Sequence, residues 1–413
     1  MRRLLSLLVL SVVATTSIAA DDFFFKPGDR VVFLGDSITE QYQYSTYMEL
    51  YLTTRFPKGH FVFLNAVIGG DTAHGGAARF QSHILDEKPT AITINFGMND
   101  AGYQAFDEGK NKLYREKTAA MLKAAKDAGV RVALCSPNCV DARLSPGWSD
   151  FKRYQETQKQ FYAPLKEIAA AGGAAFADQY AVTRTAIEAM TKDDPKAETA
   201  KPYYDGFHTA PPGGLLMAHA ILTELKAPAL VSHVGVAVGS GAKEIGCKVS
   251  DLMSTDTAVS FTRADDALPL PVQKDWLPML PYTNGLNDLN RYELLVTGLK
   301  EGKYDVLIDG VTVATHTAKE LAAGVNLGNA TAGPVFDHAQ KVFDAINRKN
   351  DLVRSRFFDV LRFNPPGWLK ISDLNQQRAE ELKKRMTRIE AEQKKVFELA
   401  QPKPHKWEVR AAK

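Results

Sequence analysis

The feature that most constrains the fold of this 413-residue chain is an alternation of short apolar runs with longer amphipathic stretches between Arg30 and Leu225. Within the apolar runs few polar residues alternate with apolar ones, which is typical of strands buried on both faces. The alternation therefore predicts an α/β fold, with a parallel sheet covered by helices on both faces. The expected strands are residues 30–34, 61–64, 91–96, 130–134 and 174–177, and the expected helices are residues 39–55, 73–85, 113–128, 150–171 and 213–225.

The pattern changes after Pro228. Short apolar runs predict a β-rich region over residues 229–330, and Asp309-Gly310 between two of them is a two-residue hairpin signal. Residues 331–413 are predicted to be helical. Two amphipathic segments there, 336–346 and 376–399, are expected to pair as an intrachain hairpin, with a dimer seam as the alternative. The Pro- and Lys-rich tail after Gln401 is predicted to be frayed.

The first 20 residues have the layout of a secretory signal peptide. Arg2 and Arg3 precede an apolar run, and small residues at 17–20 precede an acidic pair. The apolar run is shorter than the roughly 20 residues that a membrane anchor needs. We therefore expect a periplasmic or secreted protein without stable membrane insertion after cleavage, whose first folded domain spans residues 21–228.

Composition narrows the possible functions. The formal net charge is only +3, and two of the positive charges lie in the segment expected to be removed. No basic surplus remains to favour a nucleic-acid partner. No nucleotide-binding glycine loop follows the first strand, so no nucleotide cofactor is expected. Too few potential metal ligands lie near Cys135 and Cys139 in the sequence for a zinc site, so no metal is expected either. These two thiols are expected to be buried, with one disulfide bridge as the alternative.

Gly35-Asp36-Ser37 directly follows the first expected strand. Ligands of open α/β sheets bind beyond the carboxyl ends of the strands, so Ser37 would lie over the site. The amides at the start of the next helix could then stabilise an anion formed at the serine. The alternative is that Ser37 only caps that helix.

Asp205 and His208 lie in a loop before the last expected helix of the α/β domain. A carboxylate three residues before a histidine can accept the Nδ1 proton and leave Nε2 free as a base. The pair could therefore deprotonate a serine hydroxyl. The alternative is an Asx turn with an exposed histidine.

Gly70 and Asn99 lie in loops after the second and third expected strands. Acyl transfer needs hydrogen-bond donors aimed at a developing oxyanion. The backbone amide of Gly70 and the side-chain amide of Asn99 would supply two of them.

These four motifs, in this order, resemble the signature blocks of the SGNH (GDSL-type) hydrolases over about residues 30–225. The resemblance implies a three-layer, flavodoxin-like fold without a metal. It also implies that Ser37 is the nucleophile, that His208 is the base oriented by Asp205, and that the Ser37 amide, Gly70 and Asn99 form the oxyanion hole. Ile38 and Gly69 depart from the usual pattern, but neither replaces a reacting group.

Members of this family hydrolyse diverse esters, so the resemblance leaves the substrate open. The expected partner is a small ester or an acylated glycan, because the loops carry aromatic residues whose polar groups suit stacking on sugars. A lysophospholipase-like or aryl esterase is the alternative enzyme, and a carbohydrate-binding protein on an inactive fold is the alternative outside enzymes. The oligomeric state stays open. The aromatic residues are Tyr42, Tyr44, Tyr103, Trp148, Tyr203 and Tyr204.

Overall fold

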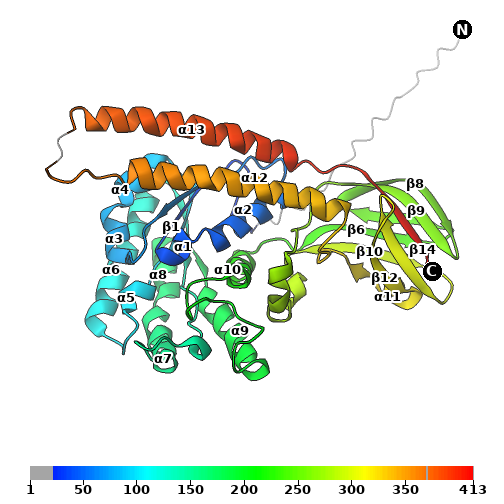
Figure 1. Cartoon of the computed structure of the whole chain (residues 1–413), viewed down its shortest axis with the longest axis horizontal. Helices are drawn as coiled ribbons and strands as arrows, with labels where there is room; N and C mark the ends of the chain where they lie inside the picture. The colour runs from blue at the N-terminus through cyan, green and yellow to red at the C-terminus, as the bar shows by residue number, and fades with distance from the viewer. Residues whose placement is uncertain (1–21, 369–370, 413) are drawn as a thin grey trace, which may run out of the picture.

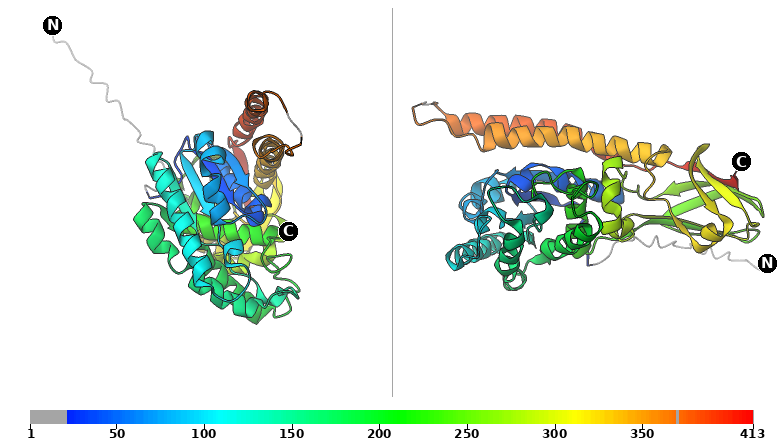
Figure 2. Two further views of the ribbon diagram at one scale, coloured as in Figure 1. Left: turned by 90° about the vertical axis from the view of Figure 1, so that its left-hand side faces the viewer. Right: turned by 60° about the horizontal axis from the view of Figure 1, so that its bottom comes forward.

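The structure is a computed structural model that describes residues 22–368 and 371–412. An α/β domain forms one end of the molecule and a group of mostly antiparallel strands forms the other (Figure 1). Two long helices lie along one side of the α/β domain, as the two views of Figure 2 also show. The predicted signal peptide lies outside the described residues.

The α/β domain is built on a parallel five-stranded sheet with the strand order β2-β1-β3-β4-β5. This order is that of flavodoxin-like folds, in which ligands bind where the strand order reverses. The predicted fold class is confirmed. The strands are β1 (Arg30–Gly35), β2 (Val62–Val67), β3 (Ala91–Asn95), β4 (Arg131–Cys135) and β5 (Ala175–Ala177).

The helices of this domain are more interrupted than predicted. The stretch expected at residues 39–55 is divided by Tyr42, whose φ of 59° is left-handed, into α1 (Ser37–Glu40) and α2 (Gln43–Arg55). Two helices, α5 (Met98–Ala101) and α9 (Gln179–Asp193), were not predicted. The others are α3 (Ala73–Ala78), α4 (Phe80–His83), α6 (Glu108–Asp127), α7 (Phe151–Tyr162), α8 (Leu165–Gly172) and α10 (Pro211–Glu224).

The strands after Pro228 form two sheets, with the orders β13-β10-β6-β7 and β12-β11-β14-β9-β8. The two sheets pack face to face, and the rings of Tyr292 and Trp407 lie 5.7 Å apart across the interface. The predicted hairpin turn is confirmed, because Asp309 and Gly310 have φ values of 49° and 81°. The strands are β6 (Leu230–Ala237), β7 (Gly241–Ile245), β8 (Cys247–Thr255), β9 (Ala258–Asp265), β10 (Arg291–Thr297), β11 (Lys303–Ile308), β12 (Val311–Thr317), β13 (Val325–Asn326) and β14 (His405–Ala411).

The C-terminal end is not frayed, so that prediction was wrong. Residues 405–411 form β14, which pairs with β11 on one side and β9 on the other. The sequence of this tail hid the strand because Pro402, Lys403 and Pro404 come just before β14 begins. The region predicted to be helical therefore ends as a central strand of the second sheet.

The two long helices are α12 (Pro334–Arg356) and α13 (Leu374–Leu399), and they pack against each other as the predicted intrachain hairpin. α12 also packs on α2 and on the edge strand β2 of the α/β sheet. A covered edge strand cannot pair with another chain, so the hairpin protects this side of the sheet. None of the helices in the described residues is both long enough and apolar enough to cross a membrane.

Candidate active site

Ser37 is the first residue of α1, two positions beyond Gly35 at the carboxyl end of β1. Asp36 is the N-cap of α1 and accepts a hydrogen bond from the Ile38 amide at 3.0 Å, so the capping role considered for Ser37 belongs to Asp36. Glycine is required at position 35, because a Cβ there would lie 2.1 Å from Oγ1 of Thr39. The tight turn frees the Ser37 side chain to face the site.

The structure brings Ser37, His208 and Asp205 together in one chain of hydrogen bonds. Nε2 of His208 lies 2.8 Å from Oγ of Ser37, and Nδ1 lies 2.7 Å from Oδ2 of Asp205. Asp205 also forms the Asx turn that was the alternative interpretation, because its Oδ1 accepts the Phe207 amide at 3.3 Å. The two oxygens of this carboxylate thus perform both tasks.

Asp205 is held in its ionised form. Burial by itself would raise the pKa of this carboxyl. The hydrogen bonds from the His208 ring and the His208 backbone amide outweigh burial, so its pKa lies below the ordinary value. An ionised carboxylate at Nδ1 fixes the tautomer that leaves Nε2 free to accept a proton.

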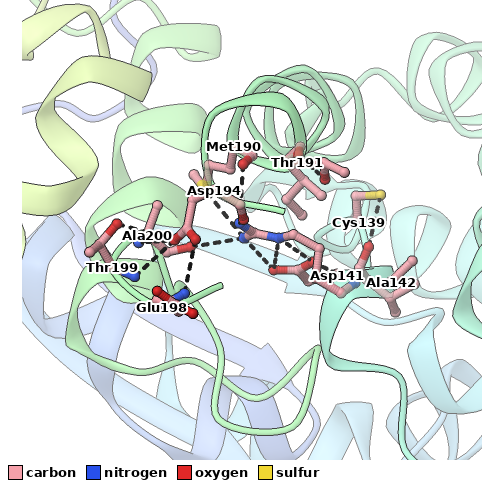
Figure 3. A network of polar contacts seen from close by, with 12 residues as sticks. Cys139, Asp141, Ala142, Met190, Thr191, Asp194, Glu198, Thr199 and Ala200 are labelled. Carbon is pink, nitrogen blue, oxygen red and sulfur yellow. Dashed lines mark hydrogen bonds and ion pairs between the residues drawn. The ribbon is translucent and has the colours of Figure 1, made fainter. Parts of the chain in front are cut away.

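A buried ion pair supports the loop that carries Asp205 and His208. Arg143 and Asp141 are almost completely buried, with N and O atoms 2.7 Å apart. The amide of Asp141 donates to the carbonyl of Gly206 at 2.7 Å, which ties this pair to the loop. The guanidinium also donates to backbone carbonyls at the end of α9 and in the segment that follows it, and Figure 3 shows them converging on one point; they belong to Met190, Asp194 and Ala200.

Gln41 connects the serine helix to the histidine loop, and sequence reasoning missed it. Its Oε1 accepts from the amide of Thr209 at 2.8 Å, and its Nε2 donates to the carbonyl of the same residue at 3.0 Å. Thr209 directly follows His208, so this bidentate bridge fixes the distance between the two loops. No local sequence signal marks the bridge, because the two residues are 168 positions apart.

The backbone amides of Gly70 and Ser37, two of the predicted oxyanion donors, make no hydrogen bond within the described residues. Gly70 has a φ of 75°, a left-handed conformation that L side chains rarely adopt. Both N–H groups are therefore free to bind an oxygen.

Asn99 is more constrained than its sequence position indicates. Its Nδ2 donates to the carbonyl of Asp71 at 2.9 Å, and its Oδ1 accepts from the Tyr103 hydroxyl at 3.3 Å. The second N–H has only a 3.4 Å contact with Oδ2 of Asp36. One N–H of the Asn99 amide therefore holds the side chain in place, while the other makes only a weak hydrogen bond.

Two further carboxyl groups lie behind these donors. Burial raises the pKa of Asp36 to about 7, and the neighbouring carboxylates of Asp100 and Asp71 add to the effect. Burial likewise raises the pKa of Asp100 to about 7. Both groups therefore change charge near neutral pH, close to the candidate oxyanion site.

Four of the six aromatic residues expected to stack on a substrate separate into two groups, and Tyr42 and Tyr103 are half-buried. Tyr44 and Tyr203 are fully buried, so their assignment to a stacking surface was wrong. Trp148 and Tyr204 are 64% and 60% exposed, and Trp148 packs edge-on against Tyr103 at 5.2 Å. The sequence could not separate the two groups because loop tyrosines also anchor cores.

Comparisons with known proteins find a matching family model and proteins of similar fold. Residues 33–213 match the model of the GDSL-like lipase/acylhydrolase family. A gut microbial diltiazem-metabolizing enzyme has a similar fold over 94% of this chain and 98% of its own, with a TM-score of 0.81 and 26% sequence identity. That similarity includes the β strands and the helical hairpin as well as the α/β domain.

Two other relatives match only part of the chain. A catalytic mutant of the acetylxylan esterase Axe2 from Geobacillus stearothermophilus covers 49% of this chain and 96% of its own, at 20% identity and a TM-score of 0.41. The uncharacterized lipoprotein YqeF of Bacillus subtilis (strain 168) is 35% identical over 86 residues, which span 19% of this chain and 35% of that relative. The α/β domain of this chain is thus similar to the GDSL-like lipase/acylhydrolase family over residues 33–213, in agreement with the resemblance of its four motifs to those of the SGNH hydrolases.

Proposed function

We propose that this protein is an exported serine hydrolase that removes small acyl groups, acetyl above all, from carbohydrate esters through a Ser37–His208–Asp205 triad. The observation that carries the proposal is the pair of short contacts, 2.8 Å and 2.7 Å, that join the three side chains. The proposal of export rests on the signal-peptide layout of residues 1–20.

The reaction has two halves. Nε2 of His208 accepts the proton of the Ser37 hydroxyl as Oγ attacks the ester carbonyl. The tetrahedral intermediate collapses, His208 returns the proton to the leaving alcohol, and the acyl group stays on Oγ. Water, deprotonated by the same nitrogen, then attacks the acyl-serine and releases the carboxylic acid.

Each tetrahedral intermediate places a negative charge on the former carbonyl oxygen. The amides of Ser37 and Gly70 and the weakly used N–H of Asn99 would donate to it. Such donors act mainly in the transition state, because the charge they stabilise is absent from the ground state. Asp205 stabilises the imidazolium that forms at the same time.

The preference for carbohydrate esters rests on the exposed aromatic rings beside the site. Trp148 and Tyr204 offer flat apolar faces with polar edges, which suit sugars better than alkyl chains. A second candidate is a bulky small-molecule ester, favoured by the similarity over nearly the whole chain to the diltiazem-metabolizing enzyme.

A fluorophosphonate probe tests the proposal directly. We expect stoichiometric labelling of the wild-type protein, with the adduct mapped to Ser37 by peptide mass spectrometry. A parallel screen of acetylated glycans, p-nitrophenyl esters of increasing chain length and diltiazem would identify the substrate class. Absence of any adduct on a folded protein would instead favour a carbohydrate-binding role.

A further inference from the structure

A polar groove of about 300 Å³ lies beside the candidate active site, between α12 and the corner where α1 meets α2. Its volume is at the lower end of the range of ligand pockets, roughly 300–1,000 Å³. Pro211, at the start of α10, completes the wall. Figure 1 shows α12 crossing over α2 next to α1.

The groove starts close to the reacting groups. Gln41, which lines it, comes four residues after Ser37, or roughly 6 Å along a helix. Pro211 comes three residues after His208 on the other side. A substrate whose ester carbonyl lies at Ser37 could therefore extend the rest of its structure into the groove.

The wall formed by α12 carries unused polar groups. The lining residues of α12 recur at intervals of three or four positions, which places them on one face of the helix. The exposed side chains of Asn347, Asp351 and Arg354 make no hydrogen bond or ion pair with any residue in the described part of the chain. Their donors and acceptors are therefore available to a ligand.

The opposite wall adds a buried polar atom without a partner. The hydroxyl of Tyr42 is inaccessible to solvent and has no hydrogen-bond partner among the described residues. An unpaired buried hydroxyl costs free energy that a bound ligand could recover. Tyr42 also has the left-handed φ of 59°, a strained conformation that turns the chain between α1 and α2 beside the groove.

The charges and polar groups that line the groove indicate the kind of ligand that it would bind. The acidic Asp351 and the basic Arg354 cancel each other in charge. The remaining unpaired groups named above are the amide of Asn347 and the phenol of Tyr42. Phe343 and Tyr47, whose rings lie 5.8 Å apart, add an aromatic surface at one end. A neutral molecule with many hydroxyl groups fits this lining, whereas an alkyl chain would leave the polar groups unpaired.

We propose that this groove binds the alcohol moiety of the substrate, a neutral oligosaccharide, and that α12 thereby gives the C-terminal hairpin a role in substrate selection. The proposal rests on the proposed function, because it assigns a subsite of the same ester hydrolysis. α12 lies outside the residues that match the family model.

The test compares two substrates, acetylated xylotriose and p-nitrophenyl acetate. We expect Asn347→Trp, which fills the groove, and Asp351→Ala to lower kcat/KM for the oligosaccharide at least ten-fold more than for the aryl ester. Most of that loss should appear in KM. Arg348→Ala is the matched control, because Arg348 is exposed on α12 and does not line the groove.

Other outcomes separate the two proposals. Equal changes for both substrates, no change for either, or a selective loss for p-nitrophenyl octanoate would overturn the groove assignment. So would a wild-type enzyme that hydrolyses p-nitrophenyl acetate but not acetylated xylotriose, which leaves the esterase proposal intact. Failure of the wild-type enzyme on every ester would reject the proposed function itself.

Discussion

Nζ of Lys349 on α12 donates to Oε2 of Glu49 on α2 at 2.9 Å, and both side chains are buried. Asn350 donates to the same carboxylate oxygen at 3.2 Å. The C-terminal hairpin is thus joined to the α/β domain by a charged contact inside the protein, 300 positions apart in sequence.

Lys349→Met is expected to destabilise the protein by about 3–5 kcal/mol, because it leaves Glu49 as an uncompensated buried charge. Denaturant unfolding measures the change. Lys341→Met, at an exposed position of the same helix, is the control and should change stability by less than about 0.5 kcal/mol.

The double variant Lys349→Met/Glu49→Leu should recover most of that loss, because replacing both partners removes the unpaired charge. A double variant as unstable as the single one would contradict the ion pair as the cause.

Asp36→Asn should stabilise the protein at alkaline pH. The folded state raises the pKa of Asp36 from 3.8 to about 7, so the folded protein binds this proton more tightly than the unfolded chain does. Wild-type stability therefore falls as pH rises from about 4 to about 7. Asparagine keeps the helix-capping oxygen and carries no charge.

Melting temperatures at two pH values measure this effect. At pH 8 the variant should melt at least about 2–4 °C above the wild type, which corresponds to 1 kcal/mol for a domain of this size. At pH 4 the two should agree. A variant that is less stable at pH 8 would show that the carboxylate is needed there.

Gln41→Met removes the bridge between the serine helix and Thr209 while keeping a similar volume. We expect kcat for p-nitrophenyl acetate to fall between about ten- and hundred-fold, because a small misplacement of His208 relative to Ser37 slows proton transfer. KM should change little. Gln81→Met, at an exposed site, is the control, and a kcat within a factor of two of wild type would remove Gln41 from the positioning of the triad.

Asn99→Ala should lower kcat by about 10²–10³, the usual cost of removing one oxyanion donor, with a smaller effect on KM. Asn99→Asp should be worse, because a carboxylate would repel the oxyanion. If Asn99→Ala mainly lowers the melting temperature and keeps kcat within a few-fold, the residue only shapes its loop through Asp71 and Tyr103.

The sequence predicted the α/β sheet and the four loops at its carboxyl edge because both depend on local signals. Apolar runs with few alternating polar residues indicate β1 to β5. Short motifs indicate Ser37, Gly70, Asn99 and His208. The placement of α12 has no such signal, because Lys349 meets Glu49 only through the tertiary fold. The bridge from Gln41 to Thr209 was missed for the same reason.

Steady-state hydrolysis of p-nitrophenyl acetate by Ser37→Ala, compared with the wild-type enzyme, tests the assignment of the nucleophile most directly. Because Ser37 and His208 act as one unit, the account predicts a loss of at least about 10³-fold in kcat, with an unchanged melting temperature. A folded Ser37→Ala protein that retained a tenth of the wild-type rate would contradict it.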